Sequence, residues 1–352
     1  MQVIRYINKD SLDFKNYIIS DISSVRDALI KLNLTKKTLF VYSNDSKKII
    51  GAITDGDIRR GFLKKARPDS NVKELMNLSP ITSKEMDNDS DYLKLMSENK
   101  VNSLAVTDTS GRLLLITLMS FNESELTSEK VAVLMAGGIG SRLSPLTDNC
   151  PKPMLKVSGT PLLESLIKRL KKYGYSKIYI SVNYLSEKII DYFQDGEKLN
   201  IKIEYISEDK PLGTAGSLHL LKGKINNPFL VMNGDVISEI DFKNFLNFHF
   251  SRNSKATMAV KLHEMQSDYG VVETKGLNII GFKEKPIYSN YINTGIYILN
   301  PESLKLLNGQ KIDMPELFDL LKNNNLETLV YPMYEAWKDI GNIDQFKSLT
   351  DE

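Results

Sequence analysis

Two stretches in the first third of the chain share one pattern of apolar and polar positions. Residues 39–54 (LFVYSNDSKKIIGAIT) and 103–117 (SLAVTDTSGRLLLIT) each read as a strand, a polar turn and a second strand. A helix is predicted before each of them, over 23–34 and 90–99, because apolar residues recur there three and four positions apart. One such unit is too small to bury its own apolar face, so we expect the two units to pack as a pair.

From residue 130 onward the pattern changes to an alternation of strands and helices. Short β-rich runs occur at 177–182 (KIYISV), 201–206 (IKIEYI) and 229–235 (FLVMNGD). A helix is predicted over 161–174 (PLLESLIKRLKKYG), with proline near its start and glycine past its end. The predicted fold class is therefore α/β, with a mostly parallel Rossmann-like sheet covered by helices on both faces. Ligands bind such sheets outside the carboxyl ends of the strands.

These two patterns predict the domain organisation. Residues 122–129 are polar and show no periodicity, so they are interpreted as a linker. The linker separates a small α/β unit pair over 1–121 from an α/β domain over 130–352.

Composition and charge restrict the class of protein. With 41% hydrophobic and 26% charged residues among 352, the chain has the composition of a soluble globular protein. A formal net charge of +2 gives no support for nucleic acid or a membrane surface as partner. Cys150 is the only cysteine, which excludes an intrachain disulfide and fits a reducing compartment. No apolar run has the length of a membrane span, and the polar start does not resemble a signal peptide, so we expect a cytoplasmic protein.

A glycine-rich loop carries the first chemical signal. In VAVLMAGGIGSRLSPLT (131–147) an apolar strand opens into this loop, whose backbone N–H groups can bind phosphate oxygens. A dinucleotide fingerprint requires a third glycine where Leu143 stands, and the lysine of a P-loop is also missing. Arg142 instead follows Gly140 and can add bidentate bonds to phosphate. The alternative is a tight strand-to-helix turn with a surface arginine.

The loop belongs to an ordered set of motifs. It continues into PLTDNCPKPML (145–155), where Lys152 lies between two prolines that restrict its backbone. LMAGGIGSRLSPLT and PKPM together resemble the sugar-1-phosphate nucleotidyltransferases, and the resemblance covers about residues 130–347. Further motifs of that family follow in order: PLGTAGSL (211–218), NGD (233–235), YGVV (269–272), EKP (284–286), NTGIY (293–297) and WKDIG (337–341).

The resemblance implies a reaction and a role for each matching residue. In this family a sugar 1-phosphate attacks the α-phosphorus of a nucleoside triphosphate, and pyrophosphate leaves without a covalent enzyme intermediate. The implied nucleotide-binding residues are Ala136, Gly137, Gly138, Gly140, Glu208, Gly213 and Thr214. The implied catalytic residues are Arg142, Lys152 and Asp235, and the implied Mg²⁺ ligands are Asp235 and Asp339. The implied sugar-phosphate residues are Gly270, Glu284, Lys285 and Asn293.

Each role has a simpler structural alternative. Asp235 or Asp339 can instead cap a helix or a turn. The segment KEKP (283–286) can be a solvated charged hairpin.

Base choice is predicted from one position. Thymidylyl- and uridylyltransferases of this family commonly have glutamine five residues before the glycine matching Gly213, whereas this chain has Glu208 there. An ionised carboxylate only accepts hydrogen bonds, so it pairs with the two adjacent donors of guanine and repels an oxygen of uracil or thymine. We therefore expect GTP as the donor. The alternative is that Glu208 is solvated and that base choice lies elsewhere.

The N-terminal pair resembles a second family. GAITDGDIRRGFL (51–63) looks like the end of a cystathionine-β-synthase (CBS) module, which implies a tandem CBS pair with a regulatory or oligomerising role. CBS modules that bind adenosine nucleotides often carry threonine or serine and, three residues later, aspartate. Thr54 and Asp57 match this spacing, whereas Thr117 is followed there by Ser120. One adenosine-type nucleotide site is implied, and a purely structural, dimer-forming pair is the alternative; either reading fits a homo-oligomer.

The combined architecture implies a function. A CBS pair ahead of this catalytic domain resembles bacterial glucosamine-1-phosphate guanylyltransferases, which make GDP-glucosamine for legionaminic acid and surface glycans. Mannose-1-phosphate guanylyl transfer and glucose-1-phosphate thymidylyl or uridylyl transfer are the alternatives.

Three other classes of protein receive little or no support from the sequence. A catalytically silent regulatory subunit usually lacks the loop arginine, the lysine or the metal carboxylates, and this chain retains Arg142, Lys152, Asp235 and Asp339. The incomplete glycine fingerprint disfavours a dinucleotide-dependent oxidoreductase, and HEMQS (263–267) is not the H-E-x-x-H motif of a zinc hydrolase.

Overall fold

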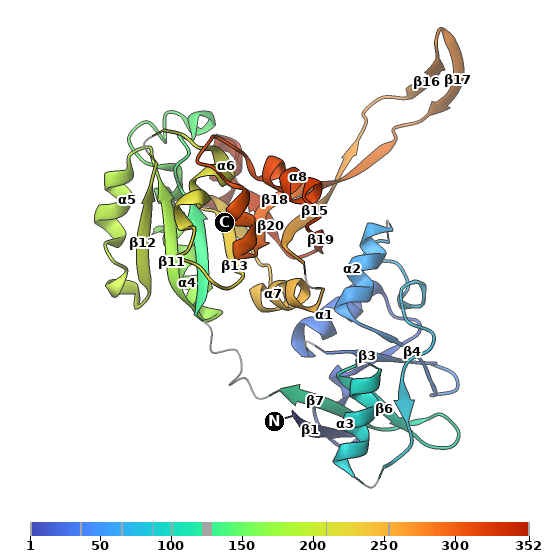
Figure 1. The fold of residues 1–352 in the computed structure, drawn as a ribbon. Coiled ribbons are helices and arrows are strands. Elements are labelled where there is room, and N and C mark those ends of the chain that lie inside the picture. The colour runs from blue at the N-terminus through green and yellow to red at the C-terminus, as the bar shows by residue number, and fades with distance from the viewer. Residues whose placement is uncertain are drawn as a thin grey trace. The chain divides into compact units, whose positions relative to one another are not determined.

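The computed structural model describes residues 2–35, 37–64, 66–86, 88–99, 101–121, 129–208, 210–252 and 254–350. The chain divides into two compact units, Met1–Thr127 and Ser128–Glu352, and each is described here by itself (Figure 1). Of the predicted linker over 122–129, residues 122–128 lie outside the described residues.

The N-terminal unit contains the predicted repeat. Each half has a short strand, a helix and two further strands, and the first strand pairs parallel to the second while the third runs antiparallel to it. The first half consists of β2 (Ile18–Ser20), α1 (Val25–Thr35), β3 (Leu39–Tyr42) and β4 (Ile49–Ile53). The second half consists of β5 (Thr82–Ser83), α3 (Asp89–Glu98), β6 (Ser103–Thr107) and β7 (Leu113–Phe121). Both predicted helices and both hairpins are confirmed.

The two halves share one apolar core. Phe40 and Ala52 of the first half pack in one buried cluster with Ala105 and Ile116 of the second. The expectation that the halves pack as a pair is therefore confirmed.

A strand at the start of the chain completes this unit. β1 (Gln2–Asn8) pairs antiparallel with β7, at the edge of the sheet β1-β7-β6-β5. No local pattern predicts this strand, because its partner lies more than a hundred residues away along the chain. Two short 3₁₀ helices are η1 (Phe14–Asn16) and η2 (Val72–Glu74).

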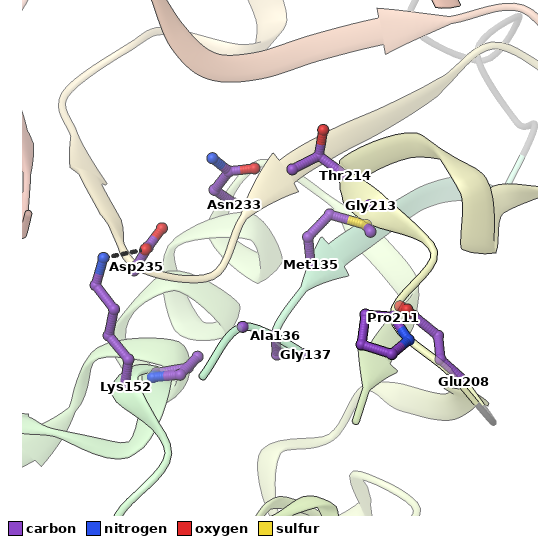
Figure 2. Close-up of a pocket in the computed structure, with 12 residues that line it drawn as sticks. Met135, Ala136, Gly137, Lys152, Glu208, Pro211, Gly213, Thr214, Asn233 and Asp235 are labelled. Carbon is purple, nitrogen blue, oxygen red and sulfur yellow. Dashed lines mark ion pairs between the residues drawn. The ribbon is translucent and has the colours of Figure 1, made fainter. Parts of the chain in front are cut away.

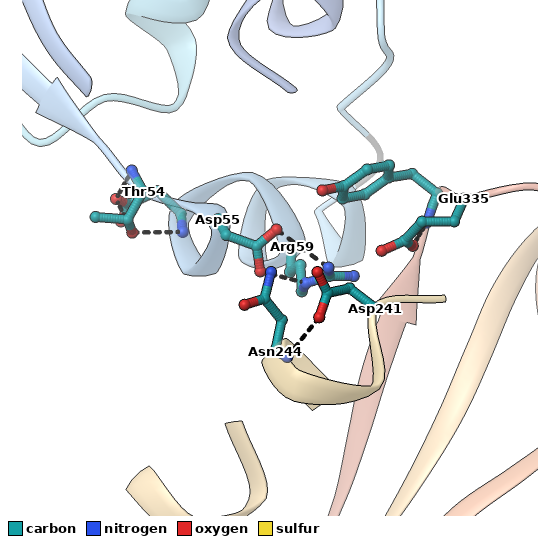
Figure 3. A network of polar contacts seen from close by, with 8 residues as sticks. Thr54, Asp55, Arg59, Asp241, Asn244 and Glu335 are labelled. Atoms are coloured by element: carbon teal, nitrogen blue, oxygen red, sulfur yellow. Dashed lines mark hydrogen bonds and ion pairs between the residues drawn. The ribbon is translucent and has the colours of Figure 1, made fainter. Parts of the chain in front are cut away.

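The helix α2 (Asp55–Leu63) follows β4 and begins with a capping box (Figure 3). The Thr54 hydroxyl accepts from the Asp57 N–H at 3.3 Å, and Asp57 Oδ2 accepts from the Thr54 N–H at 2.8 Å. Asp55 and Arg59 form an ion pair one turn apart, at 2.6 Å. Thr117 has a different environment, because it lies buried inside β7 rather than before a helix.

The C-terminal unit is built on a seven-stranded sheet with the order β12-β11-β8-β13-β18-β15-β19. Its strands are β8 (Lys130–Met135), β11 (Tyr175–Val182), β12 (Lys202–Ser207), β13 (Phe229–Asn233), β15 (Ala256–Gln266), β18 (Ile287–Leu299) and β19 (Thr328–Met333). β18 runs against both of its neighbours, and the other neighbouring strands pair parallel. The prediction of a mostly parallel sheet is confirmed.

Helices cover both faces of this sheet. Successive residues of β8 point to opposite faces, so Ala132 and Leu134 join one core cluster and Val131 and Val133 join the other. The first cluster is covered by α4 (Leu162–Lys172), α5 (Ser186–Phe193) and α7 (Phe242–Ser251). The second is covered by α6 (Gly213–Gly216), η7 (Ser217–Leu221), η8 (Pro301–Leu306) and α8 (Met314–Asn323).

Shorter elements connect these strands and helices. Three antiparallel pairs of short strands are β9 (Lys156–Val157) with β10 (Thr160–Pro161), β14 (Val236–Ser238) with β20 (Trp337–Asp339), and β16 (Val271–Lys275) with β17 (Asn278–Lys283). The remaining short helices are η4 (Ser141–Leu143), η5 (Lys152–Met154), η6 (Glu197–Leu199) and α9 (Ile343–Thr350).

The pair β16–β17 forms an arm that extends away from the sheet (Figure 1). Ile280 and Phe282 on this arm are 64% and 74% exposed. Among the helices described for the chain, none combines the length and the apolar character needed to cross a membrane.

Candidate functional site

The glycine-rich loop leaves the carboxyl end of β8 and folds back toward Lys152. Gly140 has a positive φ of 68°, a conformation that suits glycine. A Cβ at this position would lie 3.1 Å from both the Lys152 Cβ and the Thr147 Cγ2. The Thr147 hydroxyl also donates to the Gly140 carbonyl at 2.9 Å. Glycine therefore allows the loop and Lys152 to approach one another closely.

A cluster of charged side chains lies beside this loop. Lys152 forms an ion pair with Asp235, and its Nζ lies 4.0 Å from Asp339 Oδ1. Asp235 follows β13, while Asp339 ends β20 and pairs with Val236 of β14. The β14–β20 pairing thus brings together two carboxylates that are more than a hundred residues apart.

The pKa of Asp339 is raised above its usual value of 3.8. Burial is the main cause, and the nearby charge of Asp235 adds to it. The positive charges of Lys152 and Arg142 act in the opposite direction. Arg142, on η4, is therefore close enough to act electrostatically on the same cluster.

One pocket of about 250 Å³ connects the loop and the cluster. Figure 2 shows Lys152 and Asp235 at one end of it and Glu208 at the other, with Ala136 and Gly137 between them. The lining residues are Met135, Ala136, Gly137, Gly138, Lys152, Pro153, Glu208, Pro211, Gly213, Thr214, Asn233 and Asp235. The pocket thus has a charged end and an end lined by the half-buried carboxylate of Glu208.

Glu208 is held by hydrogen bonds to its side chain and to its backbone. Its Oε1 accepts from the Ser181 hydroxyl at 2.6 Å, and its Oε2 accepts from the Leu212 N–H at 2.9 Å. The Asn183 amide donates to the Glu208 backbone carbonyl at 2.8 Å. The side chain therefore has a defined orientation at the pocket wall.

The adjoining wall, made by Gly213 and Thr214, is tied to the start of α8. Gly213 has a φ of 78°, and a Cβ there would lie 2.6 Å from the Ile312 carbonyl oxygen. Asp313 Oδ1 accepts from the Thr214 N–H at 2.8 Å and from its hydroxyl at 3.2 Å. The Thr214 hydroxyl oxygen also accepts from the Met314 N–H at 2.8 Å. The start of α8 thus fixes this wall.

The predicted sugar-phosphate residues lie outside this pocket. Gly270 and Glu284 are neighbours at the base of the β16–β17 arm, where a Cβ on Gly270 would lie 3.1 Å from Glu284 Oε2. Lys285, next to Glu284, has a φ of 40°, which is uncommon for a residue with a side chain. Asn293 lies in β18 and donates to the Tyr297 hydroxyl at 2.7 Å.

The structure also brings two residues to the site for which the sequence analysis predicts no role. Asn233 lines the pocket, and it lies within the NGD motif that signalled Asp235. Ser181 supports Glu208 from inside β11, and no local motif marks it.

The carboxylate pair can be tested as a magnesium site. Within the described ranges, no three His, Cys, Asp or Glu side chains gather in a way that would hold a metal by themselves. Mg²⁺ usually binds through one or two carboxylates and completes its shell with water and substrate phosphates. Asp235 and Asp339 therefore fit a magnesium ion that binds together with a triphosphate.

The predicted nucleotide residues of the N-terminal unit are engaged with one another. Asp57 Oδ2 accepts from the Thr54 hydroxyl at 2.6 Å, and Asp57 Oδ1 pairs with Arg60. These contacts form the helix cap at the start of α2, and the adenosine-type site stays a prediction.

The C-terminal unit is similar in sequence to known proteins. A family profile described as "Nucleotidyl transferase" matches residues 131–352. A "Probable mannose-1-phosphate guanylyltransferase 1" from Oryza sativa subsp. japonica is 38% identical over 221 residues, which are 60% of this chain and 61% of that protein. A "UTP--glucose-1-phosphate uridylyltransferase" from Synechocystis sp. is 33% identical over 236 residues, 61% of each chain. The chain thus spans about three fifths of the length of these curated relatives.

A solved structure agrees with the fold. The structure of HddC from Yersinia pseudotuberculosis complexed with GMP-PN has a TM-score of 0.50 and 26% identity. It covers 63% of this chain and 98% of that one.

Proposed function

The chain belongs to the nucleotidyl transferase family, and from this premise we propose that it transfers a guanylyl group from GTP to a sugar 1-phosphate and releases pyrophosphate. The observation that carries this proposal is the pocket itself. Its glycine loop leads from the carboxylate of Glu208 at one end to Lys152 and Asp235 at the other. A nucleoside triphosphate has the same order of parts, from base to phosphates.

At the charged end, positioning and charge neutralisation carry the reaction. The N–H groups of the glycine loop bind phosphate oxygens, and Arg142 and Lys152 neutralise their charge. Asp235 and Asp339 hold the magnesium ion, which supplies further neutralisation at the phosphates when bound. Because the β14–β20 pairing brings the two aspartates close to Lys152, they would hold the metal beside the phosphates that Lys152 binds.

At the other end, Glu208 selects guanine. Its carboxylate accepts from the two adjacent donors of the guanine edge, and such a bidentate pair discriminates between bases by about 1–3 kcal/mol. The relatives named as mannose-1-phosphate guanylyltransferases support this donor.

The sugar phosphate is assigned to the base of the β16–β17 arm, at Gly270, Glu284 and Lys285, together with Asn293. The named relatives favour mannose 1-phosphate as the acceptor. Glucosamine 1-phosphate, for the legionaminic acid pathway, is the second acceptor, favoured by the paired repeat ahead of the catalytic unit.

The test is pyrophosphate release by the full chain with Mg²⁺, across GTP, UTP and dTTP and across mannose, glucosamine and glucose 1-phosphates. We expect turnover with GTP, and the acceptor with the highest kcat/KM identifies the sugar. A best rate with UTP or dTTP would refute the role of Glu208. Absence of turnover with every pair would instead favour the catalytically silent regulatory subunit.

For the N-terminal unit we propose a CBS pair that binds one adenosine-type nucleotide near Thr54 and Asp57 and regulates the catalytic unit or its assembly into a homo-oligomer. The paired halves with a common core support it.

A further inference from the structure

We propose that two buried serines, Ser181 and Ser217, determine the base preference of the pocket by fixing how the Glu208 carboxylate presents its oxygens. This inference rests on the proposed function and extends it to residues that do not line the pocket. Ser181 lies in β11 and Ser217 starts η7, and both side chains are fully buried.

The three side chains form a chain of hydrogen bonds. The Ser181 hydroxyl oxygen lies 2.6 Å from Glu208 Oε1 and 3.0 Å from the Ser217 hydroxyl oxygen. A hydroxyl has one hydrogen, and an ionised carboxylate only accepts. Ser181 must therefore donate to Glu208, and Ser217 must donate to Ser181. Hydrogen bonds to a charged group are about twice as strong as neutral ones, which favours this direction.

The second carboxylate oxygen of Glu208 accepts a hydrogen bond from a group that can only donate. Glu208 Oε2 accepts from the Leu212 backbone N–H, which is a donor only. Each carboxylate oxygen thus receives one hydrogen bond from the protein. Because a carboxylate has about four acceptor positions, each oxygen keeps one for a ligand in the pocket. Two adjacent acceptors match the two adjacent donors of guanine.

The same hydrogen-bond partners predict the orientation that a glutamine would take at position 208. The Leu212 N–H requires the amide oxygen on its side, so the amide nitrogen must turn toward Ser181. Ser181 can accept this hydrogen bond and donate to Ser217, because a hydroxyl serves in both roles. The pocket would then present one acceptor and one donor, which match the N3–H and the adjacent carbonyl of uracil or thymine. The two serines can therefore bond to glutamate or to glutamine at position 208. In each case they fix which atoms of that side chain face the pocket.

The experiment compares kcat/KM for GTP with that for UTP in the full chain, with the best acceptor sugar. Ser181→Ala is expected to lower the GTP/UTP ratio about tenfold, which corresponds to the lower part of the range for one bidentate pair. Ser217→Ala is expected to lower it less, because the bond from Ser181 to Glu208 remains. Glu208→Gln should reverse the preference toward UTP, and Glu208→Gln combined with Ser181→Ala should lose this new preference.

The control is Ser303→Ala. Ser303 is also fully buried, and its hydroxyl donates to the Asn300 carbonyl at 2.6 Å, away from Glu208. It should change the melting temperature without changing the GTP/UTP ratio.

The affinities for GTP and UTP, measured by calorimetry, separate this inference from the proposed function. If the chain turns over no pair but binds GTP more tightly than UTP, and Ser181→Ala removes that difference, the inference stands while the proposed activity fails. If Ser181→Ala and Ser217→Ala weaken GTP and UTP equally, the serines are merely structural and the inference is overturned. A preference of the unmodified chain for UTP overturns it as well.

Discussion

At the residue scale, the chemistry of the candidate site comes from charged groups held in contact with one another. Lys152 is the common partner of Asp235 and Asp339, and burial together with Asp235 raises the pKa of Asp339. The proposed binding of a metal and a triphosphate rests on these groups. Single substitutions here therefore test the proposed reaction most directly.

Asp235→Asn removes one proposed magnesium ligand and keeps the shape of the side chain. We expect kcat for pyrophosphate release to fall about 10²–10³-fold, as for the loss of one preorganised electrostatic group. The matched control is Glu302→Gln, which breaks a partly exposed ion pair with Lys255 at 2.9 Å. Exposed pairs contribute about 0–1 kcal/mol to stability, so the control should leave kcat unchanged. Retained activity in Asp235→Asn would remove the metal assignment.

We expect a second residue, His249, to make the folding stability of the chain depend on pH. His249 is buried between the Thr257 hydroxyl at 2.8 Å and the Asn300 amide oxygen at 3.1 Å. Burial lowers the pKa of His249 below its usual value of 6.5. The unfolded chain therefore binds a proton at His249 more readily than the folded chain does. Because of this difference, the free energy of unfolding falls as the pH drops below about 6.5.

The measurement is the melting temperature at pH 7.5 and pH 5.5. We expect a smaller decrease between these two values for His249→Gln than for the unmodified chain, because the amide does not titrate. Equal decreases in both proteins would mean that His249 does not carry this pH dependence.

At the element scale, one helix start supports the proposed base end of the pocket. Asp313 bonds to Thr214, Glu316 accepts from the Asp313 N–H at 2.7 Å, and Gly213 approaches the Ile312 carbonyl. The segment before α8 thus holds the pocket wall formed by Gly213 and Thr214. The helix itself contributes no side chain to the lining.

Asp313→Ala tests this support. Losing the cap and the bonds to Thr214 should lower the free energy of unfolding by about 1 kcal/mol. It should also raise KM for the nucleotide while changing kcat little, because Asp313 does not touch the charged end. Asp319→Ala, at an exposed position of the same helix, is the control and should change neither quantity. An unchanged KM in Asp313→Ala would show that the wall does not depend on this helix.

At the scale of the whole molecule, two units with separate cores are joined in one chain. The N-terminal halves share the cluster that contains Phe40 and Ile116, and the C-terminal unit has clusters on both faces of its sheet. A regulatory role for the N-terminal unit requires a ligand of its own.

Asp57→Ala tests for that ligand. We expect it to abolish binding of ATP or AMP to the full chain, measured by calorimetry, and to remove any effect of these nucleotides on turnover. Thr54→Ala weakens the helix cap by about 1 kcal/mol but keeps the carboxylate, so its melting temperature serves as the reference for lost capping alone. If Asp57→Ala leaves both nucleotide binding and activity unchanged, the regulatory proposal fails.

Much of the fold followed from local sequence. The period of apolar residues predicts the helices α1, α3 and α4, the hairpin strands β3, β4, β6 and β7, and the sheet strands β8, β11, β12 and β13, since each element is selected by residues within a few positions of one another. β1 was missed because its partner β7 lies far along the chain. Pairing at a sheet edge depends on that partner more than on a local pattern.

The candidate site also has one part that the sequence predicts and another part that it does not. The sequence by itself determined the glycine loop and marked Arg142, Lys152 and Asp235 as charged groups around it, because these lie in contiguous motifs. The family resemblance already paired Asp235 with Asp339 as metal ligands, but only the tertiary structure decided that the β14–β20 pairing joins them and that Ser181 lies behind Glu208. The physical reason is that strand register and buried hydrogen bonds connect residues that are distant in the chain, and no local periodicity records which distant groups will meet.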